Sequence, residues 1–269
     1  MSDETGFMEI DGVRLEYAWH GPGPGEQPTI LLLHEGLGSV SNWRDFPARL
    51  SNATGLGVLV YSRRGHGKSD PCDLPRPLTF MHDEAFDVVP KVIDHWKLRK
   101  VFLAGISDGG SIATIYAGGV ADPRIRCVML ISTHFFNEDV CVDAISRAKE
   151  AYEHGDLKTK LEHHHGDNVD CAFYGWCQPW LDPDFATWTI EDYLQHIRVP
   201  ILLIWGARDP YGSFAQVEAA RSQCMCPLEV VVLDESSHWA FREQPRETLQ
   251  AITDFTRRLT DLHDETVKG

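Results

Sequence analysis

Apolar residues gather in short uninterrupted runs along the chain, and each run predicts a buried strand. A strand that is covered on both faces has no need of alternating polar positions, as in a parallel sheet. Six runs share this pattern, at residues 30–33, 57–61, 101–106, 127–131, 201–205 and 230–233.

The first two strands are predicted to form a hairpin. Residues 7–10 and 13–19 alternate between apolar and polar positions on either side of Asp11-Gly12. An Asp-Gly pair favours a two-residue hairpin turn. We therefore expect the chain to open with an antiparallel pair.

Segments with helical spacing lie between most of the runs. Strands that alternate with helices predict an α/β fold, a mostly parallel sheet flanked by helices. The length of 269 residues and the hydrophobic content of 43% fit a single core of this class. The predicted helices cover residues 43–50, 85–96, 111–121, 214–222 and 247–259.

Residues 135–195 break this alternation. They contain helix-like runs and many aromatic residues but no buried-strand pattern, and we interpret them as a helical cap. The cap would be inserted into a core domain formed by residues 1–134 and 196–269. Its aromatic rings either line a substrate pocket or form the cap's own small core. Trp176 and Trp180 from the cap and Trp239 from the core are our candidates for substrate binding.

Composition narrows the possible partners. The net charge of −15 argues against nucleic acid, whose phosphates the protein would repel. The apolar runs are too short to cross a membrane, and the acidic N-terminus does not resemble a signal peptide. Seven scattered cysteines indicate reduced thiols. A cytoplasmic location is the resulting expectation.

The sequence Gly-Ile-Ser-Asp-Gly at residues 105–109 carries the strongest chemical signal. It directly follows a predicted strand and precedes a predicted helix, so Ser107 would lie on a sharp strand-to-helix turn. Glycines are needed there because a Cβ atom would collide with the neighbouring backbone. A serine exposed on such a turn is a candidate nucleophile.

Two later residues supply a candidate base and its partner. His238 follows the predicted strand at 230–233, and Asp209 follows the one at 201–205. Open α/β sheets build their sites at this carboxyl edge. The order Ser107, Asp209, His238 is that of one class of catalytic triad.

The negative oxygen that forms during acyl transfer needs two hydrogen-bond donors. The backbone amide of Asp108, at the start of the helix after Ser107, is one candidate. The second is expected in the turn at residues 34–38, from Gly36 or Leu37, and the sequence leaves that choice open.

These motifs together resemble the α/β-hydrolase fold family over nearly the whole chain. The matching pieces are the triad residues, Leu33-His34-Glu35-Gly36 for a His-Gly oxyanion turn, and residues 62–69 for an Arg-Gly-x-Gly-x-Ser loop. The resemblance implies a serine hydrolase that needs no cofactor or metal. We expect it to cleave a small carboxylic ester or a related acyl compound through an acyl-enzyme.

Two residues depart from the family pattern or add to it. Glu35 stands where glycine is usual, and its side chain either points away or narrows the oxyanion turn. The Ser-Asp-Gly-Gly sequence resembles that of amino-acid ester hydrolases, in which the aspartate helps to hold the substrate's amine. Asp108 therefore either binds such an amine or caps its helix.

Other interpretations remain beside the esterase. A carbon-carbon bond hydrolase would use the same triad and need a cationic group facing the cap. A haloperoxidase-like activity and a non-catalytic ligand-binding protein are further alternatives. We interpret His163-His164-His165 as part of a solvated helix rather than a metal site. Arg63-Arg64 is interpreted as part of a tight turn in preference to a site for an anionic substrate.

Overall fold

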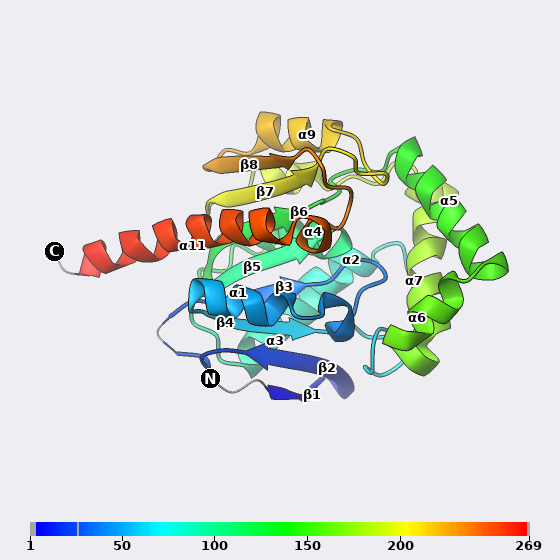
Figure 1. Cartoon of the computed structure of the whole chain (residues 1–269), viewed down its shortest axis with the longest axis horizontal. Coiled ribbons are helices and arrows are strands. Elements are labelled where there is room, and N and C mark those ends of the chain that lie inside the picture. Colours follow the sequence, from blue (N-terminus) through cyan, green and yellow to red (C-terminus); the bar gives the residue numbers. More distant parts are fainter. Residues whose placement is uncertain (1–3, 26, 268–269) are drawn as a thin grey trace.

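The computed structural model describes residues 4–25 and 27–267, with side chains described up to residue 260. Its strands form one sheet in the order β1-β2-β4-β3-β5-β6-β7-β8. Figure 1 shows this sheet at the centre of the molecule with helices on both faces, as the α/β prediction requires. The strands are β1 (Glu4–Ile10), β2 (Val13–His20), β3 (Thr29–Leu33), β4 (Gly57–Tyr61), β5 (Val101–Ile106), β6 (Ile125–Ile131), β7 (Ile201–Gly206) and β8 (Leu228–Leu233).

The predicted hairpin forms at Asp11 and Gly12. Both residues have positive φ, 52° and 77°, which a two-residue turn between twisted strands requires. β1 and β2 pair antiparallel, and β2 continues antiparallel to β4, whereas all pairs from β4 to β8 are parallel. The antiparallel start of the chain is thus confirmed.

The last strand differs in burial from the central parallel strands. β3, β4, β5 and β7 are buried at every residue, which matches their continuous apolar sequence. β8 lies at the edge of the sheet and is only half-buried, with Val232 37% exposed. The prediction that residues 230–233 are covered on both faces holds only in part: Val230 and Val231 pack against the core clusters of opposite faces, but β8 pairs with β7 alone and stays partly exposed.

Helices pack on both faces of the sheet. One buried cluster joins Phe46, Leu50 and Phe255 to alternate strand residues, and the other joins Val92, Ile112 and Val217 to the opposite face. The helices outside residues 135–195 are η1 (Val40–Trp43), α1 (Phe46–Thr54), α2 (Phe80–Asp83), η2 (Glu84–Val88), α3 (Val89–His95), α4 (Asp108–Gly119), α9 (Ala215–Gln223), α10 (Ala240–Glu243) and α11 (Pro245–Val267).

Residues 135–195, called the insertion below, connect β6 to β7 and are helical. They hold α5 (Asp139–His154), α6 (Leu157–His165), η3 (Gly166–Asn168), α7 (Val169–Leu181), η4 (Pro183–Phe185) and α8 (Glu191–Leu194). In Figure 1 the parallel strands point towards α5, α6 and α7, so these helices lie at the carboxyl edge of the sheet. None of the described helices is long and apolar enough to cross a membrane.

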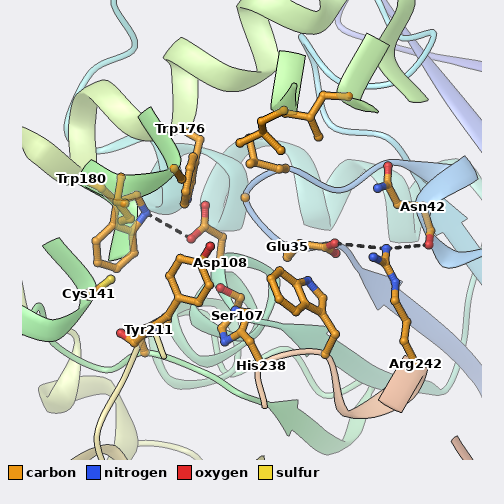
Figure 2. Close-up of a pocket in the computed structure, with 18 residues that line it drawn as sticks. Glu35, Asn42, Ser107, Asp108, Cys141, Trp176, Trp180, Tyr211, His238 and Arg242 are labelled. Atoms are coloured by element: carbon orange, nitrogen blue, oxygen red, sulfur yellow. Dashed lines mark hydrogen bonds and ion pairs between the residues drawn. The ribbon is translucent and has the colours of Figure 1, made fainter. Parts of the chain in front are cut away.

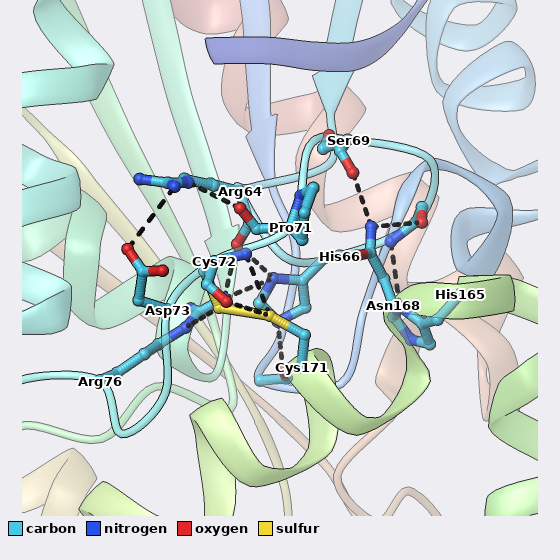
Figure 3. Close-up of a disulfide and its surroundings, with 12 residues drawn as sticks. Arg64, His66, Ser69, Pro71, Cys72, Asp73, Arg76, His165, Asn168 and Cys171 are labelled. Carbon is cyan, nitrogen blue, oxygen red and sulfur yellow. Dashed lines mark hydrogen bonds and ion pairs between the residues drawn. A yellow bond between two sulfur atoms is a disulfide. The ribbon is translucent and has the colours of Figure 1, made fainter.

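A disulfide joins the insertion to the core. Cys72, in the loop after β4, is bonded to Cys171 in α7 (Figure 3). The prediction of reduced thiols was wrong for this pair, because the fold brings together two cysteines that are 99 residues apart in sequence. The cysteine content therefore does not support a reducing compartment. Cys127, Cys141, Cys177, Cys224 and Cys226 are free.

Candidate active site

Ser107 occupies the turn between β5 and α4 in a strained conformation. Its φ is 51° and its ψ is −123°, a combination that residues with a side chain rarely adopt. A Cβ atom on Gly105 would lie 2.2 Å from the carbonyl oxygen of Gly109, and one on Gly109 would lie 2.3 Å from that of Leu33. Both positions therefore require glycine, as the motif predicted.

Asp209 and His238 meet at the same edge of the sheet. Asp209 follows β7 and His238 follows β8, and the Nδ1 atom of His238 lies 2.7 Å and 3.0 Å from the two carboxylate oxygens. The amide of Tyr211 also donates to this carboxylate at 2.8 Å. Because a carboxylate accepts, Nδ1 carries the proton and Nε2 of the neutral ring keeps a lone pair.

Burial and the neighbouring imidazole act in opposite directions on Asp209. Burial alone would raise the pKa of Asp209. The positive charge of a protonated His238 and the hydrogen bond from His238 both lower it, and the pKa ends below the usual value. Asp209 is thus ionised at neutral pH. An ionised acid at this position holds the ring and stabilises its protonated form.

Ser107 and His238 both line a cavity of about 220 Å³ between the sheet edge and the insertion. Figure 2 shows the Ser107 side chain beside the ring of His238. Each of these two residues is less than 7% exposed, at 6% and 4%. The three residues predicted as a triad are therefore gathered at one place, two in the cavity wall and Asp209 behind the imidazole.

The insertion supplies the apolar wall of the cavity. Residues of the insertion line the cavity together with Ser107 and His238; they include Ile145, Leu161, Trp176 and Trp180. Trp176 lies directly against the backbone of Gly36, where a Cβ atom would come within 2.2 Å of the indole. Both predicted tryptophans of the insertion, and Trp239 from the core, line the cavity.

Other rings of the insertion pack among themselves. Phe173 stacks on Tyr152 with ring centroids 3.7 Å apart, and Phe185 stacks on Trp188 at 5.1 Å. None of these four lines the cavity. The rings of the insertion thus fall into two sets, one that lines the cavity and one that packs within the insertion; substrate binding by the first set stays a prediction.

The turn at residues 34–38, which we call the oxyanion turn after its predicted role, is held by donors to its carbonyl groups. Imidazole nitrogens of His34, His66 and His165 lie 2.7, 3.0 and 3.0 Å from the carbonyl oxygens of three consecutive residues, Glu35, Gly36 and Leu37. Sequence analysis did not detect this arrangement, because His66 and His165 are distant in sequence from the turn.

The protonation of these rings follows from their other contacts. A backbone amide can only donate. The amide of Arg63 donates to Nε2 of His34, and the amide of Gly67 donates to Nδ1 of His165. In each ring the other nitrogen is therefore the donor. Burial lowers the pKa of all three imidazoles, that of His165 to about 4. Each ring is therefore neutral at pH 7 and donates one N–H to the turn.

Arg63 has a structural role at the same turn. Its guanidinium donates to the carbonyl oxygens of His34 and Glu35, both at 3.0 Å, and the residue is 3% exposed. Arg64 donates to the carbonyl of Pro71 at 2.9 Å. These contacts agree with the prediction of a tight turn rather than an anion site.

Glu35 points into the cavity wall instead of away from it. Its carboxylate lies 3.7 Å from the guanidinium of Arg242 and is largely buried, and its Oε2 atom has no hydrogen-bond partner (Figure 2). The Oε2 atom lies over Gly38, where a Cβ atom would come within 2.6 Å. The side chain therefore does not point away from the turn, and a narrowing of the turn stays a prediction.

Asp108 does not cap its helix. Its Oδ1 atom accepts a hydrogen bond from the indole of Trp180 at 3.2 Å, and its Oδ2 atom has no hydrogen-bond partner. The side chain is directed towards the insertion, so the capping interpretation was wrong. Burial raises its pKa, and the charge of Arg63 offsets part of this effect.

The histidine run at 163–165 is only partly solvated. His163 is exposed, but His164 contacts the hydroxyl of Ser41 at 2.7 Å and His165 is buried in the contacts described above. The prediction of a solvated helix was therefore wrong for His165. In the described part of the chain, no group of three or more histidine, cysteine or acidic side chains is placed to hold a metal ion.

The family of the chain follows from comparison with known proteins. The model of a family described as "Alpha/beta hydrolase family" matches residues 30–251. The chain belongs to the alpha/beta hydrolase family. This alpha/beta hydrolase is 31% identical to a proline iminopeptidase of Lactobacillus helveticus over 108 residues, 40% of this chain and 36% of that protein. The chain thus spans about a third of the length of the iminopeptidase that it matches.

Two further relatives match nearly the whole chain. Epoxide hydrolase 3 of Xenopus tropicalis is 22% identical over 93% of this hydrolase and 76% of its own length. The structure of an enol-lactonase from Burkholderia xenovorans superimposes with a TM-score of 0.75 at 23% identity, covering 94% of this chain and all of that one. These likenesses agree with the alpha/beta hydrolase fold and assign no substrate to this chain.

The cavity of this alpha/beta hydrolase also holds residues that the sequence did not single out. His134 lies three residues past the end of β6, and its ring centroid is 5.8 Å from that of His238. Burial lowers the pKa of His134 to about 4. Its position at the carboxyl edge of a predicted strand was the available signal.

Proposed function

We propose that this alpha/beta hydrolase is a serine hydrolase that cleaves a small carboxylic ester or a related acyl compound. The observation that carries the proposal is the strained turn at Ser107, which shares one cavity with the His238 ring that Asp209 orients. A serine becomes a useful nucleophile when a base lies beside it. The combined arrangement supports acyl transfer.

In the proposed reaction, Nε2 of His238 takes the hydroxyl proton of Ser107 as its oxygen attacks the substrate carbonyl. The carbon–oxygen bond to the leaving alcohol then breaks, and His238 returns the proton to that alcohol. A water molecule repeats the sequence on the acyl-enzyme and releases the acid. Asp209 stays ionised and balances the imidazolium in both halves.

The proposed donors to the oxyanion are the amide of Asp108 and that of Gly36 or Leu37. Asp108 begins α4, where free amides and the helix dipole favour negative charge. Gly36 and Leu37 line the cavity, and their carbonyl groups are held by His66 and His165. Such prior positioning makes oxyanion donors effective.

The cavity wall supports a substrate with a short apolar part and an amine. Trp176, Trp180 and Leu161 offer apolar surface, and Asp108 offers a buried carboxylate oxygen without a partner. A buried ammonium requires an opposite charge. Amino-acid esters are therefore the preferred class within the proposed activity.

The carbon-carbon bond hydrolase receives less support. Its substrate carboxylate would need a free cation, and Arg242 is the cation in the wall of the cavity. Its guanidinium already donates to the carbonyl of Asn42 at 2.8 Å and lies beside Glu35. A carboxylate next to Glu35 would be repelled.

A fluorophosphonate probe tests the nucleophile. We expect the wild-type protein to be labelled and Ser107→Ala not to be, with Ser111→Ala, a buried serine one turn further along α4, as the matched control that keeps its label. Equal labelling of wild type and Ser107→Ala would contradict the proposal. A panel of p-nitrophenyl esters, lactones, amino esters and carbon-carbon cleavage substrates then identifies the substrate class.

A further inference from the structure

We propose that His165 is a positioning residue through which the insertion holds the oxyanion turn in its active geometry. This inference rests on the proposed serine hydrolase activity and adds a residue that lies outside the triad and the oxyanion donors. His34 and His66 come from the core, whereas His165 ends helix α6 of the insertion. It is therefore the one imidazole of the three that ties the turn to a separate part of the chain.

The contacts of His165 fix its ring from both sides. Its Nδ1 atom accepts from the amide of Gly67 at 3.0 Å, so Nε2 carries the proton and donates to the carbonyl of Leu37 at 3.0 Å. The residue is 3% exposed, and its ring packs edge-on against that of His66, with an angle of 64° between the ring planes. The ring thus bridges the loop after β4 and the oxyanion turn.

The chain that follows this bridge is anchored to the core at two points. The Asn168 amide group donates to the carbonyl oxygens of Gly67 and Ser69 at 3.1 and 2.6 Å, and the disulfide holds Cys171 one turn further along. Figure 3 shows His165, Asn168 and the disulfide side by side against this loop. The position of His165 relative to the core is therefore well determined.

Peptide planarity explains how a bond to a carbonyl orients an amide. Each carbonyl group is coplanar with the amide of the next residue, so a donor to Gly36 orients the amide of Leu37. His66 makes that contact, and His165 holds the peptide on the other side of Leu37. With both planes held, the two backbone dihedrals of Leu37 have little freedom left.

Loss of the His165 contact should therefore affect the transition state more than substrate binding. Oxyanion donors act on charge that develops during the reaction, and removal of one whole donor lowers kcat by about 10²–10³-fold. A loosened turn keeps its donors but aims them less well. We expect a smaller loss, about 10-fold in kcat, with KM changed by less than about threefold.

Two substitutions separate the two bonds of His165. In His165→Asn the side-chain oxygen lies near the Nδ1 position and can accept from the amide of Gly67, but the side chain is too short to reach Leu37. In His165→Gln the side-chain NH2 group reaches the Nε2 position and can donate to the carbonyl of Leu37. His163→Asn, at an exposed position in the same helix, is the matched control. The readouts are kcat and KM with p-nitrophenyl butyrate and the rate of fluorophosphonate labelling.

We expect His165→Asn to lose about 10-fold in kcat and in labelling rate, and His165→Gln and the control to stay within about threefold of wild type. Thermal unfolding of each variant shows that it is folded. Equal rates for the Asn and Gln variants would overturn the role of His165 while leaving Ser107 labelled and the hydrolase intact. Absence of labelling in the wild type would instead overturn the proposed function.

Discussion

The cavity has two walls that are built in different ways. The wall from the sheet edge carries Ser107, in a strained backbone conformation, and His238, which is hydrogen-bonded to Asp209. The wall from the insertion presents apolar side chains such as Ile145, Leu161 and Trp176, which are held by packing. Directional bonds determine the position of an atom more closely than packing does.

Under the proposed function, chemistry belongs to the sheet wall and selectivity to the insertion wall. A change in the sheet wall should slow every substrate to the same extent, because all substrates pass through the same oxyanion. A change in the insertion wall should alter the preference among substrates. Two residues cross this division: Asp108 comes from the core and contacts Trp180, and His165 comes from the insertion and contacts the oxyanion turn.

The largest effect is expected for Asp209→Asn. The amide cannot balance an imidazolium and favours the wrong tautomer of His238, so kcat should fall about 10³–10⁴-fold on all esters alike. Asp234→Asn, an exposed acid that follows β8 at the same edge, is the control and should change kcat by less than about twofold. Steady-state rates on a short and a long ester would measure this. A loss confined to one ester would contradict the division of the walls.

Asp108→Asn should separate substrates that carry an amine from those that do not. The variant keeps the size of the side chain but removes its charge, so we expect kcat/KM for an α-amino ester to fall by about 10–100-fold. A neutral ester of matched size should lose less than about threefold. Equal losses on the two esters would mean that Asp108 acts in the chemistry rather than in selectivity.

Acid should weaken the folded state through the buried imidazole of His165. The pKa of this ring is about 4 in the folded protein against a usual value of 6.5, so the unfolded chain takes up a proton first as pH falls. The stability that comes from the neutral ring is complete above about pH 6.5 and is lost progressively towards pH 4. Between pH 7 and pH 5 wild type should therefore lose roughly 1–2 kcal/mol more than His165→Gln. Urea unfolding at the two pH values measures the difference, and parallel losses in both proteins would contradict this assignment.

The smallest effect on rate is expected in the insertion wall. Leu161→Ala enlarges the cavity and should raise the preference for a longer acyl chain by a few-fold, while kcat on an acetyl ester stays within about twofold. The lost packing should lower the free energy of unfolding by roughly 2–3 kcal/mol. Leu181→Ala, in α7 and outside the cavity wall, is the control and should leave the preference unchanged. An unchanged preference in Leu161→Ala would show that the insertion does not select the acyl group.

The sheet wall could be predicted from the sequence because its residues follow strands. Continuous apolar runs identify buried strands, and the carboxyl ends of parallel strands meet at one edge. Ser107, Asp209 and His238 each stand just past such a run, so their proximity follows from local patterns alone. The same reasoning applies to His134, which was overlooked.

The insertion wall and its links to the core could not be predicted in this way. Which rings of the insertion face the cavity depends on how its helices pack. Trp176 and Phe173 lie three residues apart in the same helix, so helical periodicity does not distinguish the ring that lines the cavity from the one that does not. The contact of His165 with Leu37 and the disulfide from Cys72 to Cys171 join positions about a hundred residues apart. Such pairs depend on the completed fold rather than on any local pattern.

The formation of an acyl-enzyme on Ser107 tests the central claim most directly. Rapid mixing of the wild-type protein with p-nitrophenyl acetate, acid quenching and mass analysis of the peptide that contains Ser107 would detect the intermediate. We predict a burst of p-nitrophenol of about one equivalent per active site and one acetyl group on Ser107. Hydrolysis that continues at the wild-type rate in Ser107→Ala, without an acetyl group on this peptide, would contradict the account.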